Sequence, residues 1–189
     1  MAHPPRLIVG ITGASGIAYG TRLLHLLRQT PVETHLVISR AAEIAMAHEG
    51  PAKVADVRAL ADRWYKTEDI AAPISSGSFI TQGMIIAPCS VRSMSEIATG
   101  VTSSLLTRAA DVVLKERRRL VLVVRETPLH TGHLRTMTAL SEIGAIIYPP
   151  VPAFYAKPDS IDDMVDHTAS RVLDLFGIDV GHVMRWGET

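Results

Sequence analysis

The chain has 189 residues and a mass of 20.5 kDa, which is enough for one domain with a buried core. Its 19 Lys and Arg residues balance 19 Asp and Glu residues, so a chain built chiefly to track nucleic-acid phosphates is excluded. The mean hydropathy is +0.21, yet no apolar run approaches the roughly 18 residues of a membrane span. We therefore expect neither nucleic acid nor a membrane as partner, and expect the apolar surplus to be buried between subunits.

Cysteine usage and the start of the chain bear on the compartment. The single cysteine, Cys89, excludes an internal disulfide and a zinc site made of several thiolates. The first residues, MAHPPRLIVG, lead into a strand-like run without a charged and then apolar leader. We therefore expect a reducing, cytoplasmic location.

Apolar runs alternate with helical patterns along the whole chain. Residues 6–12 predict a strand, 16–28 a helix, 33–39 a second strand and 40–48 a second helix. Further short apolar runs, typical of strands buried on both faces, lie at 84–88, 120–125 and 145–149. Amphipathic helices are predicted at 103–118, 134–143 and 161–176. This alternation predicts an α/β fold, a single-domain, doubly wound parallel sheet of Rossmann-like or flavodoxin-like type over residues 1–189.

Small polar residues follow four of the predicted strands. They are TGASG at 12–16, Ser39-Arg40, Cys89-Ser90 and Arg125-Glu126. Ligands of doubly wound sheets bind beyond the carboxyl ends of the strands, so we expect these four ends to converge on one crevice. Backbone amides and hydroxyls at a helix start suit a phosphate group. The irregular segment 67–83, with SSGS at 75–78, is a candidate binding loop.

Several patterns have a plain structural reading beside a functional one. The glycines of the first turn are required either by the backbone conformation of a tight turn or by the binding of a phosphate group. The spacing of Gly13, Gly16 and Gly20 departs from the G-x-G-x-x-G fingerprint of dinucleotide-binding proteins. His130 and His133 lack a matching carboxylate pattern, so we expect no metal site. We expect Cys89 to be a buried thiol rather than a nucleophile. Residues 117–119, all arginine, predict a solvated helix end.

Four cations lie within or beside apolar elements, where a charge needs a partner. They are Arg108, Lys115, Arg125 and Arg171. Each is either part of a structural ion pair or, with the carboxylates Glu49 and Glu126, part of a site for a second anion with proton-transfer groups nearby.

The motifs taken together resemble the UbiX flavin prenyltransferases. They are GITGASG at 10–16, SSGS at 75–78, APCS at 87–90, RAADVVLKERR at 108–118, LVLVVRETPL at 120–129, PPVPAFY at 149–155, DDMVDHTASRVLDLFGI at 162–178 and RWGE at 185–188. The resemblance implies that reduced FMN accepts a dimethylallyl group from dimethylallyl monophosphate at N5 and C6, without a metal. The product, prenylated FMN, would then pass to a UbiD-type decarboxylase.

The resemblance also implies roles for individual residues. Those implied in catalysis are Ser15, Glu49, Arg108, Lys115 and Glu126. Those implied in FMN binding are Gly13, Ala14, Ser15, Ser39, Ser90, Val91, Arg92, Ser93 and Arg125. Lys115, Tyr155 and Arg171 match positions that hold the prenyl phosphate, and Arg108 is expected in the same cluster, part of which a neighbouring subunit supplies. No metal ligands are implied.

The resemblance further implies trimers assembled into a homododecamer. Two positions depart from the family pattern: Ile70 stands where some relatives carry Trp, and Arg40 where Lys is common. Two other functions stay open at this point, a non-catalytic FMN-carrier subunit of an aromatic acid decarboxylase and a flavin-dependent decarboxylase of cysteinyl peptides. The sequence leaves open the choice between a monophosphate and a diphosphate donor, and the pathway served.

Overall fold

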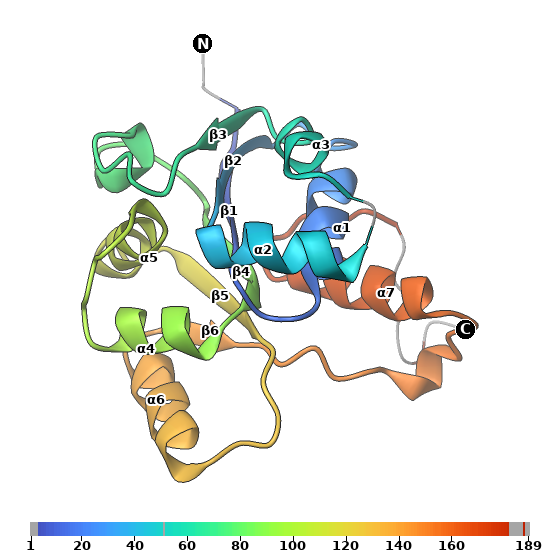
Figure 1. The fold of residues 1–189 in the computed structure, drawn as a ribbon. Helices are drawn as coiled ribbons and strands as arrows, with labels where there is room; N and C mark the ends of the chain where they lie inside the picture. Colours follow the sequence, from blue (N-terminus) through green and yellow to red (C-terminus); the bar gives the residue numbers. More distant parts are fainter. Residues whose placement is uncertain (1–3, 51, 182–186, 188–189) are drawn as a thin grey trace.

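One parallel sheet forms the centre of the molecule (Figure 1). The computed structural model describes residues 4–50, 52–181 and 187. The six strands lie in the order β3-β2-β1-β4-β5-β6, and every neighbouring pair is parallel. Their bounds are β1 Arg6–Ile11, β2 Glu33–Ile38, β3 Arg63–Tyr65, β4 Gly83–Cys89, β5 Arg119–Val124 and β6 Ala145–Ile147. This is the strand order of dinucleotide-binding Rossmann folds, so the predicted fold class is confirmed.

Helices cover both faces of this sheet. They are α1 Ile17–Leu27, α2 Arg40–Glu49, α3 Val54–Arg58, α4 Val91–Ala98, α5 Leu105–Lys115, α6 Thr131–Glu142 and α7 Ile161–Asp174, with short 3₁₀ turns at Pro73–Ser75 and Phe154–Ala156. Successive strand side chains enter two separate cores, because side chains alternate along a strand. Leu7 and Val9 of β1 pack in the core that includes α1 and α7, whereas Ile8 packs in the core that includes α5. Helices α5 and α7 therefore lie on opposite faces of the sheet.

The chain winds away in opposite directions from β1 and β4, so the switch point of the topology lies between these two strands. Buried Thr12 joins them: its hydroxyl donates to the carbonyl oxygen of Pro88 at 2.8 Å and accepts from the N–H of Ser90 at 2.7 Å. On one side the N–H of Ser39 donates to Ile11, and on the other the N–H of Arg125 donates to Cys89. These bonds fix four adjacent strand ends as one edge.

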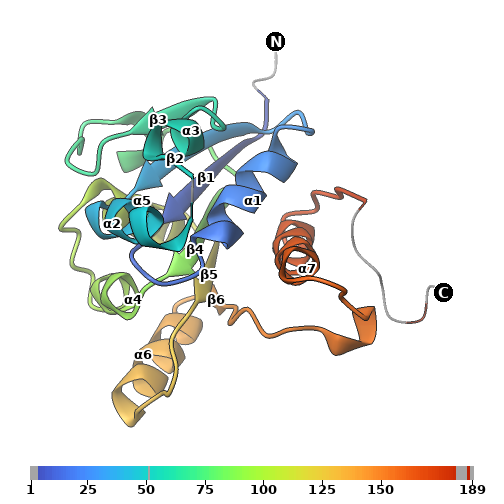
Figure 2. The same ribbon diagram turned by 45° about the vertical axis from the view of Figure 1, so that its right-hand side comes forward.

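Residues 149–160, here called the arm, leave the sheet after β6 and lead to α7. Figure 2 shows the arm extending away from the strands before α7 returns beside α1. Val151 and Phe154 on the arm are 73% and 75% exposed, an unusual exposure for large apolar side chains. Within the part of the chain that is described, no helix has the length and apolar character needed to cross a bilayer.

The structure corrects several predicted boundaries and adds β3, α3 and α4. Helix α5 ends at Lys115, and Arg117 adopts a left-handed backbone conformation with φ 56°. The predicted solvated helix end at 117–119 is confirmed only in part, since Arg117 and Arg119 are exposed but none of the three arginines belongs to the helix. Arg118 donates to the carbonyl oxygens of Gly77 and Phe79, and Arg119 begins β5, because the chain must turn there to enter the sheet.

Candidate functional site

A cavity of about 440 Å³ lies at the carboxyl edge of the sheet, and we call it the switch-point pocket. It collects five residues to which the resemblance assigned FMN binding: Gly13, Ser39, Ser90, Arg92 and Ser93. The other residues that line it are Arg40, Ala41, Thr67, Glu68, Ile70, Glu96, Ser103, Ser104, Leu106 and Thr107. Three of the four predicted strand ends thus meet at this pocket, whereas Arg125 and Glu126 of the fourth do not line it.

Three helices begin at this pocket, each capped by a serine that lines it. The hydroxyl of Ser39 accepts from Ala42 N–H at the start of α2, and that of Ser90 accepts from Ser93 N–H at the start of α4. Ser104 caps α5 by accepting from Thr107 N–H at 3.3 Å. The N-terminal ends of helices carry partial positive charge, so three of them around one cavity form a setting for a phosphate.

Ser104 and Thr107 also line the pocket, but they were not among the predicted site residues. A signal for them exists, because Ser104 and Thr107 form a capping box directly before an apolar helical run. This signal was missed because the helix was predicted to begin at Ser103, so Ser104 was taken as a residue of the helix and not as its N-cap.

Gly13 lets the first loop approach the start of α2. A Cβ atom on Gly13 would lie 2.4 Å from the Cβ of Ala41 and 3.0 Å from its carbonyl carbon. Ala41, Ile70 and Leu106 give the pocket apolar wall beside its hydroxyl and amide donors. This donor set fits the phosphate of FMN and the apolar walls fit a flat ring.

The charged side chains Arg92 and Glu96 of the pocket form an ion pair with each other. Glu96 accepts from the hydroxyl of Ser103 at 2.7 Å and from Nε of Arg92 at 2.9 Å. Burial acts to raise the pKa of Glu96, but these two hydrogen bonds outweigh it and hold the pKa below its usual value. Arg92, 81% exposed, keeps the rest of its guanidinium open to the solvent.

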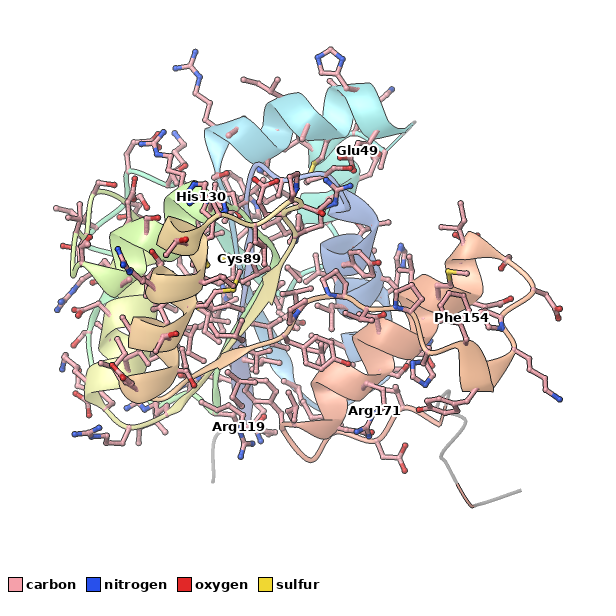
Figure 3. The ribbon with its side chains drawn as sticks, turned by 90° about the horizontal axis from the view of Figure 1, so that it is seen from below. Glu49, Cys89, Arg119, His130, Phe154 and Arg171 are labelled. Atoms are coloured by element: carbon pink, nitrogen blue, oxygen red, sulfur yellow. The ribbon has the colours of Figure 1, made fainter. Side chains whose placement is uncertain are left out.

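Glu49, the last residue of α2, binds the start of α1. Its carboxylate accepts from the N–H of Gly16 at 3.0 and 3.1 Å and from the N–H of Ile17 at 3.0 Å. The first N–H groups of α1 are therefore satisfied by a carboxylate. Glu49 lies beside the loop that carries Ala14 and Ser15, and Figure 3 shows it next to α1 at the carboxyl edge.

Arg125 and Glu126 follow β5 at the same edge. Burial raises the pKa of Tyr19 on α1, and the positive charge of Arg125 partly offsets that rise, which places Arg125 near Tyr19. Glu126 is exposed and accepts from the N–H of Thr127 at 2.9 Å. Val91, also assigned to FMN, begins α4 directly after Ser90.

Cys89 is fully buried, as expected, and burial raises its pKa to about 12. A thiol with so high a pKa is a poor nucleophile at neutral pH. The prediction of a buried structural thiol is confirmed.

The cations assigned to the prenyl phosphate do not meet in one chain. We call Arg108, Lys115 and Arg171 the donor cations. Arg108 and Lys115 lie on α5, whereas Arg171 lies on α7, on the opposite face of the sheet. Tyr155 lies on the arm, its hydroxyl 3.4 Å from Nε2 of His167 on α7. In Figure 3 Arg171 and Phe154 lie together at the α7 side, away from Cys89.

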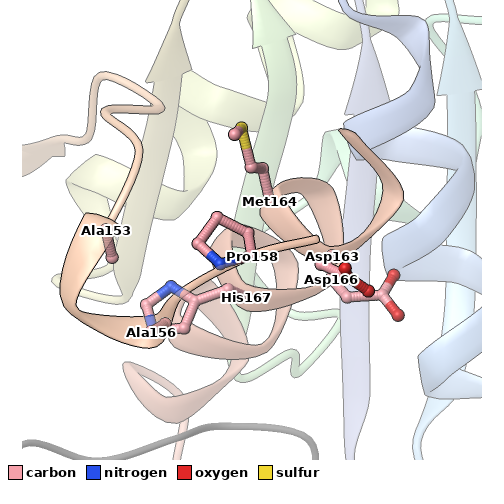
Figure 4. A pocket seen from close by; sticks show the side chains of 7 residues that line it. All are labelled: Ala153, Ala156, Pro158, Asp163, Met164, Asp166 and His167. Carbon is pink, nitrogen blue, oxygen red and sulfur yellow. The ribbon is translucent and has the colours of Figure 1, made fainter. Parts of the chain in front are cut away.

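A smaller cavity of about 230 Å³ lies between the arm and α7 (Figure 4). It is lined by Ala153, Ala156, Pro158, Asp163, Met164, Asp166 and His167. Asp163 belongs to the capping box of α7, and Asp166 pairs with Arg22. The described residues that line this cavity include two carboxylates and no Lys or Arg, so it does not suit a phosphate.

His130 and His133 take a structural role at the start of α6. Their rings stack with centroids 3.7 Å apart, and Nδ1 of His130 accepts from the N–H groups of Gly132 and His133. Across residues 4–50, 52–181 and 187, no three His, Cys, Asp or Glu side chains are grouped so as to hold a metal ion.

Comparison with known proteins places this geometry in a family. Residues 1–173 match the family model described as Flavoprotein. A flavin prenyltransferase UbiX of Escherichia coli strain K12 is 60% identical over 174 residues, which cover 92% of each chain. The solved structure of AnUbiX (PadA1) in complex with FMN and dimethylallyl pyrophosphate has a TM-score of 0.97 at 49% identity, covering 99% of this chain and 100% of that one.

A dodecameric FMN-dependent UbiX-like decarboxylase from E. coli O157:H7 has a TM-score of 0.94 at 52% identity, covering 96% and 98% of the two chains. These relatives match between 92% and 99% of the chain. The chain therefore belongs to the Flavoprotein family and, within it, to the UbiX flavin prenyltransferases.

Proposed function

We propose that this chain transfers a dimethylallyl group from dimethylallyl monophosphate to N5 and C6 of reduced FMN, giving prenylated FMN. One observation carries the proposal: 99% of the chain superposes on a solved family member that holds both FMN and dimethylallyl pyrophosphate. The switch-point pocket supports it, because three helix starts and a set of hydroxyls fit a phosphorylated flavin.

The residues of the switch-point pocket bind and orient the flavin. Ser39, Ser90, Ser93 and Arg92 bind its phosphate, and the loop at Gly13, Ala14 and Ser15, with Val91 and Arg125, holds the ring. Reduced FMN supplies the nucleophilic N5 and C6 atoms. Fixing both partners in one apolar, water-poor site turns an encounter into a nearly unimolecular step.

The donor cations and Tyr155 hold the prenyl phosphate. Positive charge fixed where the leaving group gains negative charge lowers the barrier to breaking the allylic C–O bond, and one such group contributes about 10²–10³ in rate. Glu49 and Glu126 flank the carboxyl edge and are the groups we assign to proton transfer, with the Ser15 hydroxyl as a hydrogen-bond partner.

The positions of these residues call for more than one copy of the chain. Lys115 and Arg171 lie on opposite faces of the sheet, so one prenyl phosphate contacts both only if different subunits supply them. The exposed apolar side chains of the arm support such contacts. We infer a homododecamer built of trimers. The UbiX-like relative from E. coli O157:H7 is described as dodecameric.

We assign residues 1–189 to a single FMN-binding domain that acts in the cytoplasm. The product, prenylated FMN, is then passed to a UbiD-type decarboxylase.

The direct test is an anaerobic incubation with reduced FMN and dimethylallyl monophosphate, followed by the mass of the extracted flavin. The proposal predicts an added C5H8 unit that is absent when the donor is omitted. Unmodified FMN with a correctly folded protein would refute it.

A second measurement separates catalysis from the carrier alternative. The variant Glu126→Gln keeps size and shape but removes a proton-transfer group, so we expect loss of prenylated flavin and loss of partner activation. A carrier subunit would activate its decarboxylase equally well with either residue.

A further inference from the structure

Each donor cation is paired with a carboxylate of its own helix or helix end. Arg108 lies 2.7 Å from Asp111, Lys115 lies 2.5 Å from Glu116, and Arg171 lies 2.5 Å from Asp174. The charge offered to a phosphate is therefore smaller than three isolated cations would give, since each carboxylate competes for its cation.

The pair of Lys115 and Glu116 is the one that the surrounding structure holds in place. A Cβ atom on Gly77 would lie 2.0 Å from Oε1 of Glu116 and 2.9 Å from Nζ of Lys115, so the pair packs closely over Gly77 in space that a side chain there would fill. On the other side, Arg118 lies 4.0 Å from Glu116 and donates to the Gly77 carbonyl oxygen at 2.7 Å. The hydrogen bond from Lys115 holds the pKa of Glu116 below its usual value, so the carboxylate is ionised at neutral pH.

The same loop contacts the second donor cation of α5. Nε of Arg108 donates to the carbonyl oxygen of Ser75, two residues before Gly77. The candidate binding loop of the sequence analysis, SSGS at 75–78, thus contacts both Arg108 and the partner of Lys115. Through these contacts the loop helps to position both cations.

We propose that Glu116 tunes donor specificity by acting as the counter-ion of Lys115, which reduces the advantage that the more highly charged diphosphate has over the monophosphate at this site. This inference rests on the proposed function. Coulomb attraction scales with the product of the charges, so a site with reduced positive charge loses more affinity for the diphosphate than for the monophosphate.

The test compares wild type with Glu116→Gln, which removes the charge and keeps the shape. Affinity for dimethylallyl monophosphate and for the diphosphate is measured by calorimetry with oxidised FMN bound, so that no turnover is needed. Loss of one exposed ion pair predicts about two- to fivefold tighter binding of the monophosphate. A larger gain is expected for the diphosphate, and both gains shrink at high salt. In turnover, the KM for the donor falls while kcat and the KM for FMN stay unchanged.

A second variant reaches the same pair without touching the carboxylate. In Gly77→Ala the new Cβ displaces the flexible end of Glu116, so a smaller change in the same direction is expected. The matched control is Glu43→Gln, since Glu43 is as exposed as Glu116, at 35%, and lies 2.6 Å from Arg58 on another part of the molecule. Its donor affinities should equal those of wild type.

The outcomes separate this inference from the proposed function. Unchanged or weaker donor binding in Glu116→Gln, with an unchanged ratio of diphosphate to monophosphate affinity, overturns the role of Glu116 even if prenylated flavin forms. Absence of prenylated flavin in wild type refutes the proposed function, whereas the binding ratios would still decide on Glu116.

Discussion

The two halves of the candidate site differ in how the chain builds them. The flavin half lies within one chain, at a single edge where four strand ends are tied by backbone and Thr12 hydrogen bonds. The donor half consists of cations on α5 and α7, on opposite faces of the sheet, each paired with a nearby carboxylate. On the proposed assignment, the residues of the flavin half come from one chain, whereas those of the donor half come from more than one.

Because of this difference, we expect substitutions in the two halves to affect different properties of the protein. A change in the flavin half acts through the fold and the helix caps, so it alters stability and FMN binding together. A change in the donor half acts on exposed, paired side chains, so it leaves the isolated fold intact and appears only in the assembled enzyme. The predictions below test that separation.

The largest effect is expected from removing one donor cation, and coexpression of two such variants tests whether different chains supply these cations. Lys115→Ala and Arg171→Ala alone should each lower prenylation by about 100-fold or more. Coexpressed in equal amounts they should recover roughly a quarter of wild-type activity, because both intact residues meet at about one interface in four. Flavin mass spectrometry on the mixed oligomers measures this. Coexpressed variants no more active than either parent would show that one chain supplies both residues.

In the flavin half, Gly13→Ala should reduce stability and FMN binding together. The new Cβ would collide with Ala41, including its backbone, and overpacking of this kind costs about 1–3 kcal/mol. Thermal unfolding and FMN titration measure the two effects. Gly50→Ala is the control, since a Cβ atom at this position would meet no other atom within 4 Å and the backbone is extended with φ 176°. Equal behaviour of the two variants would contradict the close approach.

A smaller loss is expected from His130→Ala, which removes the cap of α6 next to the loop of Glu126. Loss of an N-cap costs about 1 kcal/mol, and Asn is among the best caps. We therefore expect His130→Asn to restore the Tm that His130→Ala lowers. Failure of Asn to restore it would show that stacking on His133, rather than capping, is the role of the ring.

The smallest effect is expected at Ile70, which lines the switch-point pocket and is 68% exposed. Ile70→Trp adds an aromatic face beside the site, and a cation–π contact at an exposed position contributes about 0.5–1 kcal/mol. We expect kcat/KM to rise about two- to fivefold with no change in Tm. A fall in kcat/KM would place the aromatic ring of the relatives in another role.

Much of the fold could be predicted from sequence because parallel strands buried on both faces are short apolar runs. Strand β3 was missed since its residues, RWY, form an exposed three-residue edge. Helix α4 was missed because it is only eight residues long, although Met94 and Ile97 mark a buried face.

The two halves of the candidate site also differed in how far the sequence predicted them. Polar residues after strands predicted the flavin half, since the topology alone brings strand ends together. The donor cations had an equally good explanation as ion pairs, and the structure does pair them. Only the resemblance to a family assigned them a substrate, because periodicity carries no information on which surfaces meet in an oligomer.

The burial of Cys89 also bears on how the protein withstands air. Reduced flavins react with oxygen to give peroxide, and Cys89 lies one residue before Ser90 of the switch-point pocket. Oxidation of cysteine proceeds through the thiolate, and burial raises the pKa of Cys89 so that little of the thiol is ionised at neutral pH. We therefore expect peroxide formed beside a bound flavin to oxidise this buried sulfur atom slowly.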